Sequence, residues 1–210
     1  MKAWRAAALT VWMVTGAAGV TVPDSLTVVI FDYAGTPRRV LASAAKEARQ
    51  AFRAAGVETD WILCGAVQGC YVPERFLQVK ILPRPIPNTP VSHQGLATTT
   101  MCPIADRCAA SYVFYDRILT FADNVGSPVD VALGYVMAHE IGHLMGLGHR
   151  PGGIMNAGFT SRNLHDAETG WLTFAQEDAT ELRAAAARSQ SASEAAREIK
   201  TSARRAGVAE

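Results

Sequence analysis

The segment that most constrains this chain is residues 138–150, which read AHEIGHLMGLGHR. His139 and His143 stand four positions apart, and side chains at this spacing on an α-helix project from one face, one turn apart. Gly146 lets such a helix end in a left-handed turn that most residues resist. The turn would bring His149 toward the other two histidines. The segment therefore predicts a helix, a tight turn and a cluster of three imidazoles.

Three imidazoles arranged in this way can bind one metal ion, because their ring nitrogens can reach a common point at about 2.0–2.1 Å. Three protein ligands with the fourth position open to water are typical of catalytic zinc sites, whereas structural zinc sites are closed. We therefore expect one catalytic Zn²⁺ with the ligands His139, His143 and His149. Glu140 follows the first of these histidines, and we expect it to be the general base that takes a proton from water.

The segment resembles the signature of the metzincin metallopeptidases, H-E-x-x-H-x-x-G-x-x-H followed by a Met-turn. Residues 153–156, Gly-Ile-Met-Asn, look like the Met-turn, with Met155 as an apolar floor under the metal and not a ligand. The alternative is an ordinary core methionine. The resemblance implies an α/β (α+β) fold with a mixed twisted sheet, a backing helix, an active-site helix and a C-terminal helix. It also implies a zinc endopeptidase in which a zinc-activated water hydrolyses peptide bonds.

Similarity to the matrixin branch adds candidate substrate-binding residues. In that branch an edge strand above the cleft pairs with the extended substrate through main-chain hydrogen bonds, and residues 95–101 occupy the corresponding place. A plain edge strand or loop is the alternative for this stretch. The resemblance also implies that two residues after the Met-turn wall a specificity pocket. The candidates are Gly95, Leu96, Ala97, Thr98, Asn156 and Phe159.

Three departures from the family pattern leave the subfamily open. Arg150 follows the third histidine, where metzincin subfamilies carry other marker residues. Met155 stands only six positions after His149, which leaves a short connecting loop. Ala157 stands two positions beyond the methionine, where some branches have a tyrosine. No phenol from that position can therefore help to stabilise an oxyanion.

Length and composition fit one globular domain. The chain has 210 residues, 49% of them hydrophobic, and a formal net charge of +1. This balance excludes a disordered chain and gives no charge excess for nucleic-acid binding. We expect a peptide or protein substrate and no nucleic-acid partner, and the sequence does not determine the oligomeric state.

The first twenty residues have the layout of a secretory signal peptide. Lys2 and Arg5 precede an uncharged apolar stretch, residues 6–20, which ends in small residues. The alternative is an uncleaved membrane anchor, for which the apolar stretch is short. We expect a signal peptide over 1–20, a catalytic domain over 21–188 and a polar, flexible tail over 189–210. The mature protein would be secreted or periplasmic, without stable membrane insertion.

Four cysteines form two close pairs, which suits an exported protein in an oxidising compartment. We expect the disulfides Cys64–Cys70 and Cys102–Cys108, although four cysteines permit three connectivities. A structural zinc site with four cysteine ligands is the alternative. Such sites favour pairs two to four residues apart, and these pairs are wider.

Hydrophobic patterning predicts alternating strands and helices, which indicates a layered α/β domain with a mixed sheet. A proline-rich stretch over 83–90 predicts an extended loop. The predicted strands are residues 26–33, 57–64, 76–82, 95–101 and 111–119, with a turn at 123–126. The predicted helices are residues 37–56, 128–145 and 174–188.

Two other functions remain open from the sequence. A zinc hydrolase could act on small amides or esters instead of peptides. A non-catalytic zinc-binding protein could share the same scaffold, although the presence of Glu140 argues against it. The two remaining histidines, His93 and His165, are expected at the surface.

Overall fold

The computed structural model describes residues 25–65, 69–87, 95–101 and 109–205. The expected signal peptide and the expected Cys102–Cys108 disulfide lie outside the described residues. The Cys64–Cys70 disulfide is confirmed, and it ties the end of the second strand to the loop that follows. Over the part of the chain that is described, no helix combines the length and apolar character needed to cross a bilayer.

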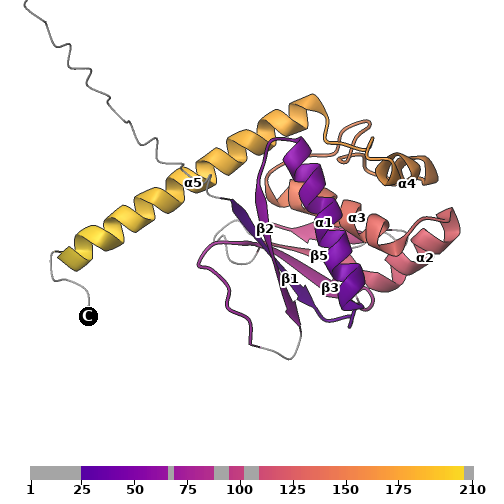
Figure 1. The fold of residues 1–210 in the computed structure, drawn as a ribbon, viewed down its shortest axis with the longest axis horizontal. Helices are drawn as coiled ribbons and strands as arrows, with labels where there is room; N and C mark the ends of the chain where they lie inside the picture. The colour runs from indigo at the N-terminus through magenta and orange to yellow at the C-terminus, as the bar shows by residue number, and fades with distance from the viewer. Residues whose placement is uncertain (1–24, 66–68, 88–94, 102–108, 206–210) are drawn as a thin grey trace, which may run out of the picture.

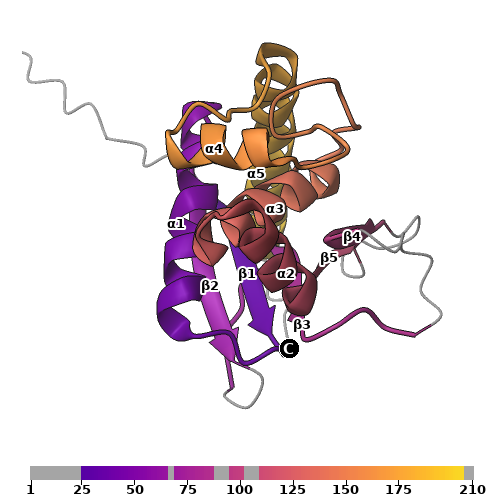
Figure 2. The ribbon, with the colours of Figure 1, turned by 90° about the vertical axis from the view of Figure 1, so that its right-hand side faces the viewer.

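Five strands form one mixed sheet in the order β2-β1-β3-β5-β4. The strands are β1 (Leu26–Asp32), β2 (Thr59–Gly65), β3 (Leu77–Leu82), β4 (Ala97–Thr100) and β5 (Ala110–Phe114). The first four in the sheet order are parallel, and β4 is antiparallel to β5 at the edge. Figure 2 shows β2 beside α1 at one end of the sheet and β4 at the other. The expected mixed α/β architecture is confirmed.

Five helices accompany the sheet (Figure 1). They are α1 (Arg38–Ala54), α2 (Tyr115–Val125), α3 (Val129–Leu144), α4 (Ser161–Glu168) and α5 (Gln176–Arg205). Helix α1 packs along β2 and against α3, which in turn packs on β3, β4 and β5. At Gly134 a Cβ atom would lie 2.7 Å from the Ala44 carbonyl oxygen. The two helices therefore approach too closely for any larger residue there.

The core lies between α1, α3 and the sheet. Helix α1 buries small and aromatic residues at helical spacing, including Ala44, Ala48 and Phe52. Strand β1, which lies between β2 and β3, contributes Val28 and Ile30, which are fully buried. These residues alternate along the strand and so face the helices together. Helices α1 and α3 pack together on one side of the sheet, and α3 lies next to the edge strand β4.

The predicted strand over 111–119 is wrong beyond Phe114. Helix α2 begins at Tyr115 and continues through the predicted turn to Val125, where Gly126 ends it with φ 71°. Ile118 and Ala122, four positions apart, are its buried residues. Aromatic and β-branched residues had favoured a strand, but the buried face has the period of a helix.

The C-terminal region also differs from expectation. Helix α5 continues to Arg205 instead of ending near residue 188, because residues 176–205 contain neither glycine nor proline. Its C-terminal half extends away from the sheet in Figure 1. Helix α4 was not predicted. Its N-terminus is closed by Thr160 and Asn163, each of whose side chains bonds the other's backbone N–H.

Candidate metal centre

Helix α3 carries three of the expected site residues, His139, Glu140 and His143. It is buried on every side from Ala132 to Gly142, which makes it the central helix of the molecule. The helix ends at Leu144 and Gly146 then adopts φ 98°, a left-handed conformation that favours glycine. This turn brings His149 back against α3, as its spacing in the sequence predicts.

The three histidines meet through their Nε2 atoms. His143 Nε2 lies 3.1 Å from His139 Nε2 and 3.1 Å from His149 Nε2. The Nδ1 atoms of the first two point elsewhere, 2.7 Å from the Ile154 carbonyl oxygen for His139 and 2.8 Å from the Leu147 carbonyl oxygen for His143. A carbonyl oxygen only accepts, so each Nδ1 carries the proton and donates it. When these two rings are neutral, their Nε2 atoms therefore present lone pairs to each other.

Such a donor set suits a metal ion. Lone pairs this close repel one another unless a cation lies between them. Tetrahedral Zn²⁺ would separate its nitrogen ligands by about 3.3 Å, close to the 3.1 Å found here. The carbonyl bonds to Nδ1 are the second-shell contacts that orient metal-binding histidines. All the candidate ligand atoms lie within 4.8 Å of one another.

The electrostatic setting favours neutral imidazoles, the form that ligates metals. Burial, helped by the neighbouring His143 and His149, lowers the pKa of His139 to about 4, although its bond to Ile154 acts in the opposite direction. Burial and His143 also lower the pKa of His149. These two rings thus remain neutral at pH values where an exposed histidine is protonated.

Met155 is fully buried and packs against α3 at Gly142, between His139 and His143 in the sequence. Its sulfur would meet a Cβ atom at Gly142 at 2.6 Å, so any larger residue there would force the methionine side chain to move. The adjoining backbone is anchored twice: Arg150 N donates to the Met155 carbonyl at 3.0 Å, and Ile154 N to the Thr173 carbonyl at 3.0 Å. The Met-turn role of Met155 stays a prediction.

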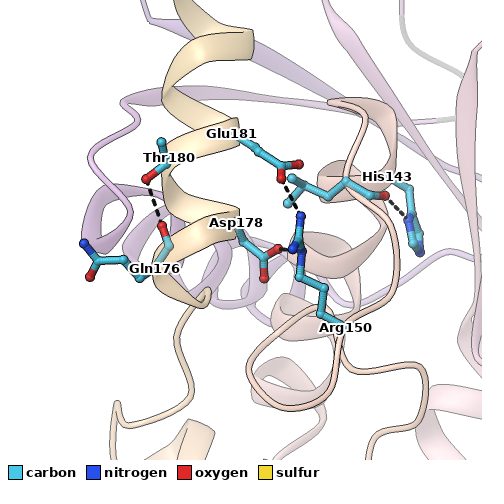
Figure 3. A network of polar contacts seen from close by, with 7 residues as sticks. His143, Arg150, Gln176, Asp178, Thr180 and Glu181 are labelled. Atoms are coloured by element: carbon cyan, nitrogen blue, oxygen red, sulfur yellow. Dashed lines mark hydrogen bonds and ion pairs between the residues drawn. The ribbon is translucent and has the colours of Figure 1, made fainter.

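Arg150 links the histidine loop to helix α5, as Figure 3 shows. Its Nε lies 2.7 Å from Asp178 Oδ1, and its Nη2 pairs with Glu181. The Asp178 side chain is fully buried, whereas that of Glu181 is half exposed. Burial raises the pKa of Asp178, and the Arg150 guanidinium opposes that rise. In the sequence, Arg150 was noted only as a departure from the metzincin pattern. No local pattern predicted its contact with Asp178, which lies 28 positions later.

Glu140 is buried beside the histidines, with 6% of its surface exposed. Its Oε2 accepts a hydrogen bond of 2.5 Å from Thr99 Oγ1 in β4. Burial raises the pKa of the Glu140 carboxyl, while the hydrogen bond from Thr99 and the nearby His143 lower it. Thr99 lies within the predicted edge strand 95–101, but the sequence prediction did not include it among the candidate substrate-binding residues and gave it no contact with Glu140.

A cleft of about 1210 Å³ opens over the cluster. The three histidines and Glu140 line it, together with residues 95–99 of the edge strand and Phe159. The Phe159 ring centroid lies 5.6 Å from that of His139. Asn156 is not among the residues that line the cleft, although it is next to the buried Met155. His165 is exposed on α4, outside the cluster.

Residues 120–197 match a protein family described as "Putative peptidase family" and named Metallopep. The match supports a metallopeptidase. It spans the three histidines, Glu140 and Met155 and continues into α5, but it does not reach the strands of the sheet. No curated protein matches the chain. The metallopeptidase assignment thus rests on the helical half of the molecule, where the candidate metal centre lies.

Proposed function

We propose that this protein is a secreted zinc-dependent endopeptidase with its catalytic domain over residues 21–188. The observation that carries the proposal is the convergence of three histidine nitrogens beside a buried glutamate on one open cleft. The match to a peptidase family supports the same class of enzyme. The Cys64–Cys70 disulfide supports an oxidising compartment after removal of a signal peptide over 1–20.

His139, His143 and His149 would hold the zinc ion, and Met155 would support them from below without ligating. Zinc in such a site supplies a Lewis acid that polarises a carbonyl and lowers the pKa of water toward neutrality. The protein supplies the neutral imidazoles and the open cleft. The choice of zinc follows from a set of three nitrogen donors, which suits this ion better than calcium or magnesium.

Glu140 would act as the general base. Its carboxylate takes a proton from the attacking water as the water oxygen bonds to the scissile carbonyl carbon. It then gives that proton to the leaving amine nitrogen as the C–N bond breaks, so the carboxylate is regenerated. Burial, which raises the pKa of Glu140, favours this acceptance because the charged form is poorly solvated.

The edge strand would bind the substrate main chain. Phe114 N donates to the Leu96 carbonyl, so these residues form a hydrogen-bonded pair of the antiparallel ladder. Such pairs alternate with non-bonded pairs, and Ala97 and Thr99 stand opposite Val113 and Ser111 in the non-bonded pairs. The backbone N–H and C=O groups of Ala97 and Thr99 therefore point to the outer edge of β4. An extended peptide could pair with them regardless of its sequence.

The remaining candidates would shape the specificity pocket. Phe159 lies next to His139 and lines the cleft together with Gly95, Leu96 and Thr98. A cleft of about 1210 Å³ exceeds the usual range of about 300–1,000 Å³ for small-molecule sites. The size of the cleft favours a peptide over a small amide or ester. Asn156 does not line the cleft, and we propose it as a pocket residue only because it adjoins Met155.

The test is hydrolysis by the purified protein. Casein and a diverse peptide library should be cleaved at internal bonds, cleavage should stop with a zinc chelator, and added zinc should restore it. A panel of small amides and esters run in parallel separates the alternative hydrolase. A protein that binds one zinc ion yet cleaves no member of the peptide library would contradict the proposal and favour a non-catalytic zinc-binding protein.

A further inference from the structure

Two hydroxyl groups from the edge of the sheet contact the buried glutamate of α3. Thr99 Oγ1 lies 2.5 Å from Glu140 Oε2 and 2.7 Å from Ser111 Oγ. Both hydroxyls also approach the Glu140 carbonyl oxygen, at 3.3 Å from Thr99 and 3.2 Å from Ser111. Thr99 and Ser111 are direct partners in the β4–β5 register. They form a non-bonded pair, in which side chains come closest.

The protons of this cluster can be assigned. An ionised carboxylate only accepts, so Thr99 must donate its single hydroxyl proton to Glu140 Oε2. The Thr99 oxygen is then free to accept from Ser111, which is fully buried and 2.7 Å away. Ser111 therefore orients the Thr99 hydroxyl, and Thr99 in turn holds one oxygen of the carboxylate. Among the described residues no hydrogen bond reaches the other oxygen, Oε1.

We propose that Thr99 is the positioning residue for the general base: its hydroxyl, oriented by Ser111, fixes Oε2 of Glu140 so that Oε1 is presented to the attacking water. The proposal rests on the proposed function. A glutamate side chain has three rotatable bonds, and a charge-assisted hydrogen bond removes the freedom of its terminal group. Preorganisation of this kind places the base at a proton-transfer distance before the substrate arrives.

The same residue also serves the substrate strand. The Thr99 backbone faces the outer edge of β4 while its side chain faces Glu140. Replacing the hydroxyl with a methyl group leaves the backbone groups in place, so substrate pairing persists and only the contact with the base is lost. The positioning role of Thr99 therefore predicts that loss of its hydroxyl lowers kcat and leaves KM unchanged.

The experiment compares Thr99→Val with Thr99→Ser in the purified zinc-loaded protein. Valine keeps the shape and β-branching of threonine without its hydroxyl, whereas serine keeps the hydroxyl. Thr99→Val should lower kcat about ten- to a hundred-fold, the usual effect of one hydrogen bond to a charged group, with KM changed by less than about two-fold. Thr99→Ser should recover most of the lost rate. The zinc content of both variants should match that of the wild type, and a cooperative thermal transition should show that both variants fold.

Thr100→Val is the matched control, because it makes the same change in the same strand. Thr100 faces away from Glu140, since successive side chains of a strand point to opposite faces, and it is exposed. This variant should keep the wild-type kcat. Ser111→Ala should reduce kcat less than Thr99→Val does. Adding it to Thr99→Val should cost nothing further in kcat, because Ser111 acts through the Thr99 hydroxyl.

The outcomes separate the two proposals. A wild-type protein without chelator-sensitive peptidase activity overturns the endopeptidase and, with it, the base that Thr99 would position. An active wild type with an unchanged kcat in Thr99→Val overturns the positioning role alone. The same conclusion follows if serine fails to restore the rate, or if KM rises while kcat stays constant.

Discussion

Two of the three candidate ligands, His139 and His143, are each fixed by two contacts of different kinds. His139 directs Nε2 to the cluster and Nδ1 to the Ile154 carbonyl, and His143 does the same with Leu147. A single α-helix therefore sets the spacing, while the loop after it sets the orientation of both rings. Loss of one ring should remove the metal, whereas loss of the neighbouring carboxylate should remove only the chemistry.

Glu140→Ala should keep its zinc and lose nearly all peptide hydrolysis. The carboxylate is no part of the histidine cluster, and general bases contribute about 10²–10⁴-fold to a rate. Elemental analysis and kcat on one fluorogenic peptide check both halves of the prediction. Hydrolysis at the wild-type rate would show that another group takes the proton from water.

His143→Ala should lose the metal. Its Nε2 lies 3.1 Å from both other candidate ligand atoms, so it stands in the middle of the donor set. The zinc content of the purified variant should fall from about one ion per chain to near zero, since two remaining nitrogens leave the site incomplete. His165→Ala, which alters an exposed histidine outside the cluster, is the control and should retain the metal.

At the scale of elements, helix α5 contacts the loop that carries the candidate ligand His149. Arg150 follows the last candidate ligand, His149, and pairs with the fully buried Asp178 of α5. The backbone N–H of Arg150 also donates to the Met155 carbonyl. Arg150 therefore joins three parts of the chain: the loop after α3, the segment around Met155 and the first turn of α5.

Asp178→Ala should destabilise the protein and speed the release of zinc to a chelator. The change removes a buried partner from Arg150, which is itself partly exposed, so we expect a loss of about 1–3 kcal/mol, less than that for a fully buried pair. Urea unfolding and the rate of zinc transfer to a chromogenic chelator measure the two effects.

Glu181→Ala is the matched control for that prediction. Glu181 pairs with the same arginine, but its side chain is half exposed, and exposed ion pairs contribute about 0–1 kcal/mol. Equal effects of the two substitutions would contradict the view that burial of Asp178 makes the contact important.

At the scale of the whole molecule, the metal-free protein should lose stability in acid. Burial lowers the pKa of His139 to about 4 from its ordinary value of 6.5. Between these values the unfolded chain binds more protons at this position than the folded protein does. The free energy of unfolding should therefore fall as the pH drops from about 6.5 toward 4, by roughly 3 kcal/mol from this residue.

Urea unfolding with a chelator present, at a series of pH values, measures this dependence. His139→Asn is the comparison, because it removes the titrating ring and leaves the other groups, including Glu140, whose raised pKa acts in the opposite sense. The difference between the two proteins should shrink as the pH falls through this window. A constant difference from pH 7 to 4.5 would contradict the prediction.

Local patterns predicted the parts of the fold that depend on neighbours in the sequence. The spacing of His139 and His143 predicted a helical pair, and Gly146 predicted the end of α3. The apolar period of α1 and the buried strand β1 were predicted in the same way. The strand predicted for residues 115–119 was wrong, because their composition suits a strand while the buried residues of α2 have helical spacing.

The sequence by itself determined the histidine cluster, since a helix and one glycine turn bring its three rings together within eleven residues. Only the tertiary structure decided what surrounds them. Thr99 reaches Glu140 from 41 positions away, and Arg150 meets Asp178 on a separate helix. No periodic pattern in the sequence predicts either contact, because one depends on how α3 packs against the sheet edge and the other on how the loop after α3 packs against α5. The three candidate metal ligands could be predicted from the sequence alone, whereas the contacts that Glu140 and Arg150 make with distant residues became visible only in the folded structure.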